Sequence, residues 1–274
     1  MSWIDAIIMG FIQGLAEFLP ISSSGHLVIF SNILGLQLSG EENLDFDAAL
    51  HVATVLSTIV VLRHEFFGLC KSFFTLRNDE NTRLVWKIIL SCIPVAIVGL
   101  CFKDQVEAFF SGSLTIVGIC LLVTAALLCF AYFFRTRTLS LPGHHYKPRN
   151  ITWLDSFIIG IGQAIAVLPG LSRSGTTIAT GILLGDKREQ VAKFSFLMVI
   201  IPILGNALLD IVKFTGEGPD AASSVGFTAL IAGFLTAFVT GCLACRWMIR
   251  VVSQGKLVYF AVYCLLVGIT CLIW

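Results

Sequence analysis

A short stretch near the start of the chain places acid–base and nucleophilic groups inside otherwise apolar sequence. It runs from Gln13 to His26 and reads Gln-Gly-Leu-Ala-Glu-Phe-Leu-Pro-Ile-Ser-Ser-Ser-Gly-His. Ser23 and His26 stand three apart at the start of an expected helix, so they share a face. A hydroxyl beside an imidazole is the minimal activated nucleophile. Glu17 can orient that histidine or, with Gln13, bind a divalent cation.

The same stretch recurs 150 residues later with a different set of polar groups. The matched pairs are Gly10 and Gly160, Gln13 and Gln163, Ser22 and Ser172, Ser24 and Ser174, and Gly25 and Gly175. Arg173 stands where the first copy has Ser23, and Val167 stands where it has Glu17. Two interrupted apolar segments at corresponding places are typical of a site at the interface of an inverted repeat. Helix kinks capped by serines are the alternative, but kinks do not require Glu, His and Arg.

The second copy has the composition of an anion site. Pro169 to Thr177 reads Pro-Gly-Leu-Ser-Arg-Ser-Gly-Thr-Thr, a glycine-rich turn that opens a helix and offers backbone N–H groups. Arg173 adds a planar set of donors that matches phosphate oxygens. The hydroxyls that can add bonds to a phosphate are those of Ser22, Ser24, Ser172, Ser174, Thr176 and Thr177. Arg173 can also pair with Glu17 until a substrate or metal arrives.

The composition predicts an integral membrane protein. Of 274 residues, 57% are hydrophobic and 13% charged, and the mean hydropathy is +0.90. A net charge of +1 gives no basic field, so we expect no nucleic-acid partner. The nine cysteines are odd in number and scattered, which argues against a disulfide framework. The start of the chain lacks the basic region of a cleavable signal peptide, so we expect none.

The apolar runs predict an all-helical, all-α fold. Runs long enough to cross a bilayer, about 17–25 residues, fall at 48–63, 84–102, 113–134, 191–212, 226–249 and 257–273. The interrupted segments, 3–34 and 153–185, are interpreted as re-entrant helical hairpins. The sequence therefore predicts six transmembrane helices and two re-entrant hairpins in an inverted repeat. The first repeat is 1–134, the second is 151–274, and a cytoplasmic linker, 135–150, joins them.

Lysine and arginine are concentrated in alternate loops. The basic loops are 63–87, 135–150 and 246–256. The positive-inside rule places them in the cytoplasm, which puts both termini outside. The first hairpin then enters from outside and the second from the cytoplasm. We expect their tips to meet in the membrane, with Ser23 and His26 facing Arg173.

The two motifs resemble the signatures of the undecaprenyl-diphosphate phosphatase family, also called bacitracin-resistance proteins. The resemblance covers essentially the whole chain, including the run Phe194-Ser-Phe-Leu. It implies hydrolysis of undecaprenyl diphosphate to the monophosphate lipid carrier of bacterial cell-wall synthesis. It also implies a divalent cation, Mg²⁺ or Ca²⁺, and a site open to the outer side of the bacterial plasma membrane.

The resemblance also implies roles for individual residues. Glu17 belongs to the family's Glu/Gln-x-x-x-Glu pair, Ser23 is the nucleophile and His26 its partner, and Arg173 binds phosphate. Gln13 departs from the many members that have glutamate there. It removes one anionic metal ligand, which weakens the case for a two-carboxylate metal site.

Two functions from different classes fit the motifs. An enzyme acting on a polyprenyl diphosphate is the first, and a transporter or flippase of a phosphorylated lipid is the second, because paired broken hairpins also occur in transporters. The Ser23 and His26 pair, present in one copy only, favours the enzyme. The sequence leaves open whether Ser23 or an activated water attacks, and whether the protein is a monomer or a homodimer in contact with membrane lipids.

Overall fold

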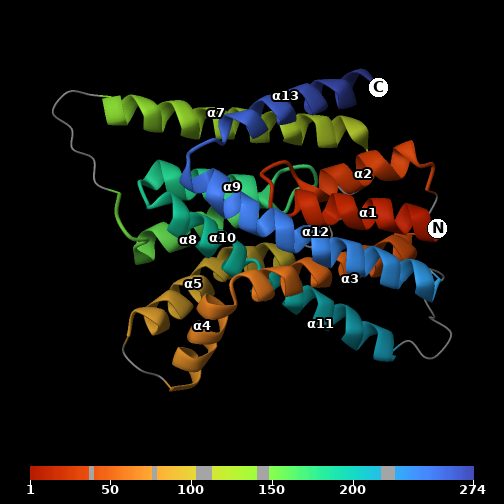
Figure 1. Cartoon of the computed structure of the whole chain (residues 1–274), viewed down its shortest axis with the longest axis horizontal. Helices are drawn as coiled ribbons and strands as arrows, with labels where there is room; N and C mark the ends of the chain where they lie inside the picture. The colour runs from red at the N-terminus through yellow and green to blue at the C-terminus, as the bar shows by residue number, and fades with distance from the viewer. Residues whose placement is uncertain (37–39, 76–78, 103–112, 141–147, 217–225) are drawn as a thin grey trace.

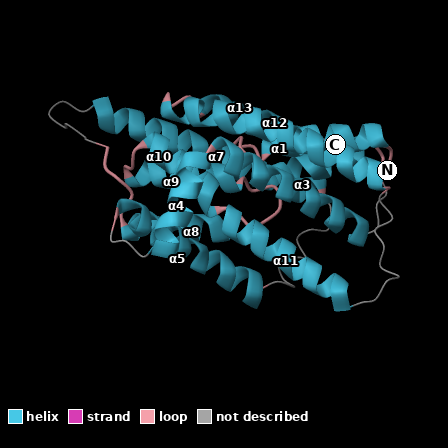
Figure 2. Ribbon diagram, turned by 60° about the horizontal axis from the view of Figure 1, so that its bottom comes forward, coloured by secondary structure: helices cyan, strands magenta, loops and turns pink. Residues whose placement is uncertain are grey.

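The computed structural model describes residues 1–36, 40–75, 79–102, 113–140, 148–216 and 226–274, so the centre of the predicted linker, 141–147, lies outside them. These residues form helices, and their one extended pairing is an isolated parallel bridge between Arg149 and Asp186 (Figure 2). The helices are α1 (Trp3–Ala16), α2 (Ser23–Ile33), α3 (Gly40–Val61), α4 (Arg63–Thr75), α5 (Glu80–Cys101), α7 (Leu114–Ser140), α8 (Trp153–Ile165), α9 (Arg173–Leu184), α10 (Arg188–Met198), α11 (Ile200–Gly216), α12 (Phe227–Ser253) and α13 (Val258–Ile273).

Each interrupted segment of the sequence is a pair of short helices with a break between them. Pro20 lies in the break between α1 and α2, and Pro169 lies in the break between α8 and α9. Proline has no backbone N–H to continue the first helix. The second helix then begins at a serine cap: Ser22 accepts a hydrogen bond of 3.2 Å from the Gly25 N–H, and Ser172 caps α9 in the same way.

The described helices make the chain a multi-pass membrane protein. Four meet the length and apolarity needed to cross a bilayer, namely Glu80–Cys101, Leu114–Phe134, Arg188–Leu208 and Phe227–Ser253. A fifth is added if Phe46–Val61 and Arg63–Thr75, which are bent by 89°, count as one span. The run predicted at 257–273 forms α13, whose 16 residues fall short of a full span. The described residues thus give four or five of the six predicted spans.

Several helices pair across the two halves of the sequence. Helix α1 packs along α12, α8 packs along α5, and α7 runs beside α13 at the top of Figure 1. Glycines permit two of these close approaches. A Cβ added to Gly10 would collide with the main-chain carbonyl of Gly233, and one added to Gly160 would collide with that of Ser91. The matched glycines of the two sequence copies therefore perform the same packing task.

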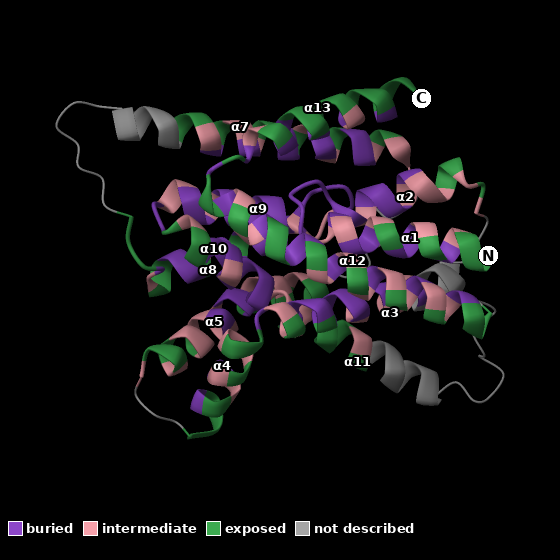
Figure 3. Ribbon diagram, viewed as in Figure 1, coloured by how far each residue is buried: buried purple, intermediate pink, exposed green. Residues whose placement is uncertain are grey.

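Burial is greatest where the two breaks meet. Figure 3 shows buried residues in and around the loops between α1 and α2 and between α8 and α9, and exposed residues on the outer helix faces. Phe18, in the first break, packs edge-on against Phe196 of α10 with ring centroids 5.3 Å apart. Large apolar side chains such as Leu100 and Ile273 are exposed on the outside. An apolar exterior around a polar centre suits a protein surrounded by lipid.

Candidate active site

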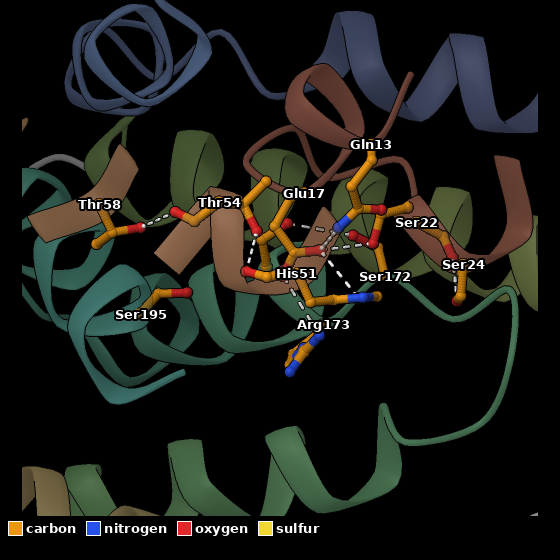
Figure 4. A network of polar contacts seen from close by, with 12 residues as sticks. Gln13, Glu17, Ser22, Ser24, His51, Thr54, Thr58, Ser172, Arg173 and Ser195 are labelled. Atoms are coloured by element: carbon orange, nitrogen blue, oxygen red, sulfur yellow. Dashed lines mark hydrogen bonds and ion pairs between the residues drawn. The ribbon is translucent and has the colours of Figure 1, made fainter. Parts of the chain in front are cut away.

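The Glu17 carboxylate is the centre of the polar network drawn in Figure 4. Glu17 follows α1 directly and its side chain is only 7% exposed. Its Oε2 accepts hydrogen bonds from Gln13 Nε2 at 3.1 Å and from Ser23 Oγ at 2.7 Å. Its Oε1 lies 3.3 Å from Arg173 Nη2. A buried carboxylate is costly in a membrane unless it is paired, and here both oxygens have partners.

Ser23 is held at the first position of α2. The residue before it, Ser22, has φ of 71°, and it is the only non-glycine residue with positive φ in the described chain. This left-handed turn redirects the chain out of the break and into α2. The Ser23 hydroxyl donates to Glu17 at 2.7 Å, which lies within the normal range of a hydroxyl–carboxylate bond. The acid is therefore the group placed to accept the Ser23 proton.

Arg173 occupies the equivalent first position of α9. It reaches Glu17 from the other sequence half, and its side chain is 29% exposed. The neighbouring Ser174 donates a hydrogen bond of 3.0 Å to the carbonyl of Leu19, so the two breaks are joined directly. The structure thus brings Ser23, Glu17 and Arg173 together at the meeting point of the two breaks. Helices α2 and α9 both begin there, and the N–H groups at a helix N-terminus favour an anion.

His26 lies close to Ser23 in sequence, but its hydrogen bonds go elsewhere. Its Nδ1 lies 2.8 Å from the Ser22 carbonyl, and its Nε2 lies 2.8 Å from the Tyr263 hydroxyl of α13. A carbonyl oxygen accepts only, so Nδ1 carries the proton and Nε2 accepts from the tyrosine. Both ring nitrogens are therefore occupied by groups other than Ser23. In this arrangement His26 fixes the strained Ser22 turn.

The remaining predicted hydroxyls hold the two breaks in place. Ser22 and Ser172 cap their helices, and each lies 3.4 Å from the hydroxyl two residues further on, Ser24 and Ser174. The Ser24 hydroxyl also accepts a hydrogen bond of 3.5 Å from the Gly170 N–H. In α9, Thr176 donates to the Ser172 carbonyl and Thr177 to the Arg173 carbonyl. These groups shape the backbone around the two breaks, and Ser174 is the one of them that also lines the cavity described next.

A small cavity opens beside Glu17 and Arg173. Its polar wall adds the hydroxyls of Thr54, Thr58, Ser174 and Ser195. Its apolar wall is formed by Phe18, Val55, Phe196, Val199 and Ile203. The cavity has a charged end and an apolar wall, and its volume of about 10 Å³ corresponds to roughly one water molecule.

The sequence analysis did not assign to the site several residues that the structure brings to this region, although Ser195 belongs to the run Phe194-Ser-Phe-Leu that it named. They are His51, Thr54, Thr58, Ser195 and Tyr263. His51 carried a usable signal, because it is a polar residue within the predicted span 48–63. Ser195 lies 2.6 Å from the Thr177 hydroxyl, but nothing local in the sequence indicates that contact.

The donor atoms on one side of Glu17 fit a divalent cation. The side-chain oxygen of Gln13, Oε1, is buried and has no hydrogen-bond partner among the described residues. It belongs to the same side-chain amide whose Nε2 donates to Glu17 Oε2. No group of three or more His, Cys, Asp or Glu side chains in the described chain, at this site or at any other, could hold a metal ion. The protein therefore offers one carboxylate and one amide oxygen, which is the small protein share typical of Mg²⁺ bound with substrate phosphates.

Comparisons with known proteins show the family of this chain. The family model described as bacitracin resistance protein BacA matches residues 6–270. An undecaprenyl-diphosphatase of Bacteroides thetaiotaomicron is 54% identical and covers 100% of this chain and 99% of its own. Those of Bacteroides fragilis and Parabacteroides distasonis are 52% and 50% identical, over 100% and 98% of this chain and 98% and 97% of their own. The chain therefore belongs to the BacA family of bacitracin resistance proteins.

Proposed function

We propose that this protein hydrolyses undecaprenyl diphosphate to undecaprenyl phosphate and inorganic phosphate. Full-length relatives named undecaprenyl-diphosphatase, at 50% to 54% identity, support the substrate. The observation that carries the reaction is the position of Glu17, which accepts a bond from Ser23 on one oxygen and contacts Arg173 with the other. A nucleophile and a phosphate-binding guanidinium therefore meet at one carboxylate, which can accept the proton of the nucleophile. In a bacterium this hydrolysis recycles the lipid carrier of cell-wall synthesis.

The reaction proceeds in two steps. Ser23 Oγ attacks the terminal phosphorus, the anhydride P–O bond breaks, and undecaprenyl phosphate leaves as an anion. Glu17 Oε2 takes the Ser23 proton over the existing hydrogen bond of 2.7 Å. Water then attacks the phosphoserine, Ser23 takes its proton back from Glu17, and inorganic phosphate leaves. One proton of the attacking water stays on the inorganic phosphate, and the other is released to solvent.

Arg173 and the two helix N-termini stabilise charge during the transfer. When the diphosphate enters, Arg173 turns its donors from Glu17 to the equatorial phosphate oxygens. Helices α2 and α9 begin at Ser23 and Arg173, whose side chains both contact Glu17, so their N-terminal dipoles can add to the stabilisation of an anion there. Positioning and electrostatic stabilisation are the contributions that phosphoryl transfer requires from a protein.

A divalent cation completes this site. Glu17 and Gln13 Oε1 would hold Mg²⁺ or Ca²⁺ together with oxygens of the substrate. Such a cation would neutralise part of the negative charge of the diphosphate. The unpartnered Gln13 Oε1 is the observation that supports it. A chelator should therefore lower turnover, and added Mg²⁺ or Ca²⁺ should restore it.

The membrane arrangement follows the alternating basic loops. Six spans and two re-entrant hairpins in an inverted repeat place the basic loops in the cytoplasm and the active site toward the outer face of the plasma membrane. Contact of the two breaks through Ser174 and Leu19 supports hairpins that enter from opposite faces. Cysteine-accessibility mapping tests this arrangement: labelling of loops 63–87 and 103–112 from the same side would contradict it.

Transport of a phosphorylated polyprenyl lipid is the second candidate function. The observation that favours it is the meeting of two broken helical segments from the two sequence halves, a feature of transporter sites. A carrier needs an anion site but no nucleophile, so the Ser23–Glu17 hydrogen bond has no use in it. Lipid movement across vesicles that persists in Ser23→Ala would reveal a transport activity separate from hydrolysis.

The decisive experiment measures phosphate release by purified protein from undecaprenyl diphosphate. Ser23→Ala should lower kcat by at least about 100-fold. Ser253→Ala is the matched control, because its exposed hydroxyl bonds only locally to the Arg250 carbonyl. Substrate labelled in its terminal phosphate should leave label on Ser23 after a rapid quench. Near-normal turnover by Ser23→Ala excludes the covalent route, and no release by the wild type with Mg²⁺ present refutes the function.

A further inference from the structure

His51 faces the Glu17 carboxylate from a third part of the chain. It lies in α3, and its Nε2 is 3.7 Å from Glu17 Oε2 (Figure 4). Its Nδ1 lies 2.7 Å from the carbonyl of Asp47, one turn earlier in the same helix. Because a carbonyl oxygen only accepts, Nδ1 carries the proton of the neutral ring, and Nε2 presents a lone pair. The ring nitrogen that lies next to Glu17 is therefore an acceptor.

Two electron-rich atoms thus face each other in this contact. A hydrogen bond cannot join Nε2 and Oε2 while neither atom carries a proton. A cation between them turns the repulsion into attraction. A carbonyl that accepts from one ring nitrogen is also the usual device by which a protein orients a histidine that binds a metal through the other. The contact has the form of two ligands of one ion.

The spacing and the burial of the pair suit a shared divalent cation. Ligand atoms that each lie about 2.1 Å from one ion are at most about 4.2 Å apart, and the 3.7 Å between Nε2 and Oε2 falls within that limit. The side chain of Glu17 is 7% exposed and that of His51 is 23% exposed. The pair is therefore mostly shielded but still reachable, so that water or substrate oxygens can fill the other positions around the ion.

Gln13 supplies a second observation that points to a cation. Its Nε2 donates to Glu17 Oε2 at 3.1 Å, while its Oε1 is buried without a partner among the described residues. A half-turn of the amide exchanges the positions of these two atoms. Oε1 then lies beside Oε2, where an oxygen is unfavourable without a cation and favourable with one. Amide, carboxylate and imidazole together offer three acceptors to one ion.

We propose that His51 is a ligand of the divalent cation at Glu17, and that it binds the cation through Nε2, together with Glu17 Oε2 and Gln13 Oε1. The inference rests on the proposed function, which places a cation at Glu17. It adds a third ligand to that cation and extends the site from the two broken hairpins to α3.

This ligand set predicts which cation the site prefers. Mg²⁺ and Ca²⁺ favour oxygen ligands, and their binding strengthens with the negative charge of the ligands. Here Glu17 brings the one negative charge, because Gln13 and the imidazole of His51 are neutral. A nitrogen ligand favours transition metals over Mg²⁺ and Ca²⁺. We therefore expect Mn²⁺ to bind this site about tenfold more tightly than Mg²⁺.

Electron paramagnetic resonance of Mn²⁺ tests the ligand without any turnover. Mn²⁺ alone is added to the purified protein in detergent, and the loss of the free-ion signal gives its Kd. The spin echo of the bound ion is then recorded, because a coordinated nitrogen modulates it. The wild type should show the modulation of ¹⁴N, and wild type made with ¹⁵N-labelled histidine should show that of ¹⁵N instead. This comparison identifies a histidine ligand in the unaltered protein.

Substitution then assigns the ligand to His51. His51→Gln keeps a side chain of similar length that ends in an oxygen, so it should lose the nitrogen modulation. Its affinity for Mn²⁺ should fall about tenfold, and its affinity for Mg²⁺, measured by competition, should change less than about threefold. His64→Gln, at an exposed position of α4, is one control and should retain the modulation. The double variant His144→Gln/His145→Gln, at positions outside the described residues, is the other.

The outcomes separate this proposal from the proposed hydrolysis. Modulation that persists in His51→Gln, or a wild type whose bound Mn²⁺ shows no histidine nitrogen, overturns the ligand role, whereas hydrolysis is judged by phosphate release alone. If the modulation depends on His51 but the wild type releases no phosphate, the proposed hydrolysis fails and the ligand role stands.

Discussion

The Tyr263 hydroxyl lies 2.8 Å from His26 Nε2, although 237 residues separate the two in the sequence. Their rings are also stacked, with centroids 5.6 Å apart. Helix α13, which is too short for a full span, therefore contributes a side chain to the support of the active site. Through His26, Tyr263 stabilises the left-handed turn at Ser22 that presents Ser23.

Tyr263→Phe should lower kcat several-fold and reduce the melting temperature. The ring contact remains, but the buried Nε2 of His26 loses its donor, at a cost of about 1–3 kcal/mol. Phosphate release and thermal unfolding in detergent measure the two effects. Tyr259→Phe, one turn earlier on the same helix and 69% exposed, should match the wild type. If Tyr263→Phe also matches the wild type, the hydrogen bond to His26 has no role in the site.

Glu17→Gln should lower kcat by about 100-fold or more while the protein still folds. The amide cannot accept the Ser23 proton, and its NH₂ group faces Arg173 or Ser23 unfavourably. Turnover under saturating substrate measures this loss. Glu80→Gln, at the exposed start of α5, is the control. Near-normal turnover in Glu17→Gln would return this acid to a purely structural role.

Gly10→Ala should destabilise the protein, because its methyl group would meet the main chain of Gly233 and push α1 away from α12. Overpacking of this kind costs about 1–3 kcal/mol. Gly205→Ala is the control: no heavy atom lies within 4 Å of the added Cβ, and alanine favours the helix. Melting temperatures in detergent should therefore move down for the first and stay level or rise for the second. A higher melting temperature in both variants would show that the contact between α1 and α12 accommodates the added methyl group.

Asp186, between α9 and α10, gives stability a pH dependence. It is buried, and its oxygens have no hydrogen-bond partner in the described chain. Burial, and then the charge of Asp155, raise its pKa to about 7, against the opposing effects of Arg149 and Lys87. The folded state thus holds this proton more tightly than the unfolded chain, so stability falls as pH rises from about 4 to about 7.

Asp186→Asn removes this dependence because asparagine does not ionise. Relative to the wild type, the variant should gain on the order of 2 kcal/mol between about pH 5 and about pH 8. Thermal melting in detergent at the two pH values measures the difference. A difference between variant and wild type that does not change with pH would mean that Asp186 does not titrate in this range.

The sequence predicted the features that depend on local residue chemistry. Pro20 and Pro169 located the two breaks. Ser22 and Ser172, which were predicted to bind phosphate, cap α2 and α9 in the structure. The meeting of Glu17 and Arg173 followed from the repeat, since two broken segments at equivalent places must bury their polar groups against each other.

What the sequence did not show depends on tertiary contacts. The spacing of Ser23 and His26 predicts a shared helix face, yet His26 bonds to the Ser22 carbonyl and to Tyr263, because the first helical turn leaves that carbonyl within reach. His51 reaches Glu17 from α3 only after the helices have packed. No spacing rule links residues on elements so far apart.

The cross-pairing of α1 with α12 and of α8 with α5 has a consequence for biogenesis. The ribosome makes α1 long before α12, so the first hairpin meets the membrane before its main packing partner exists. Until then Gln13 and Glu17 lack the protein environment that shelters them, and insertion of the hairpin has to wait for the second half of the chain. Two separately expressed halves would each remain incomplete, and would give a stable protein only when made together.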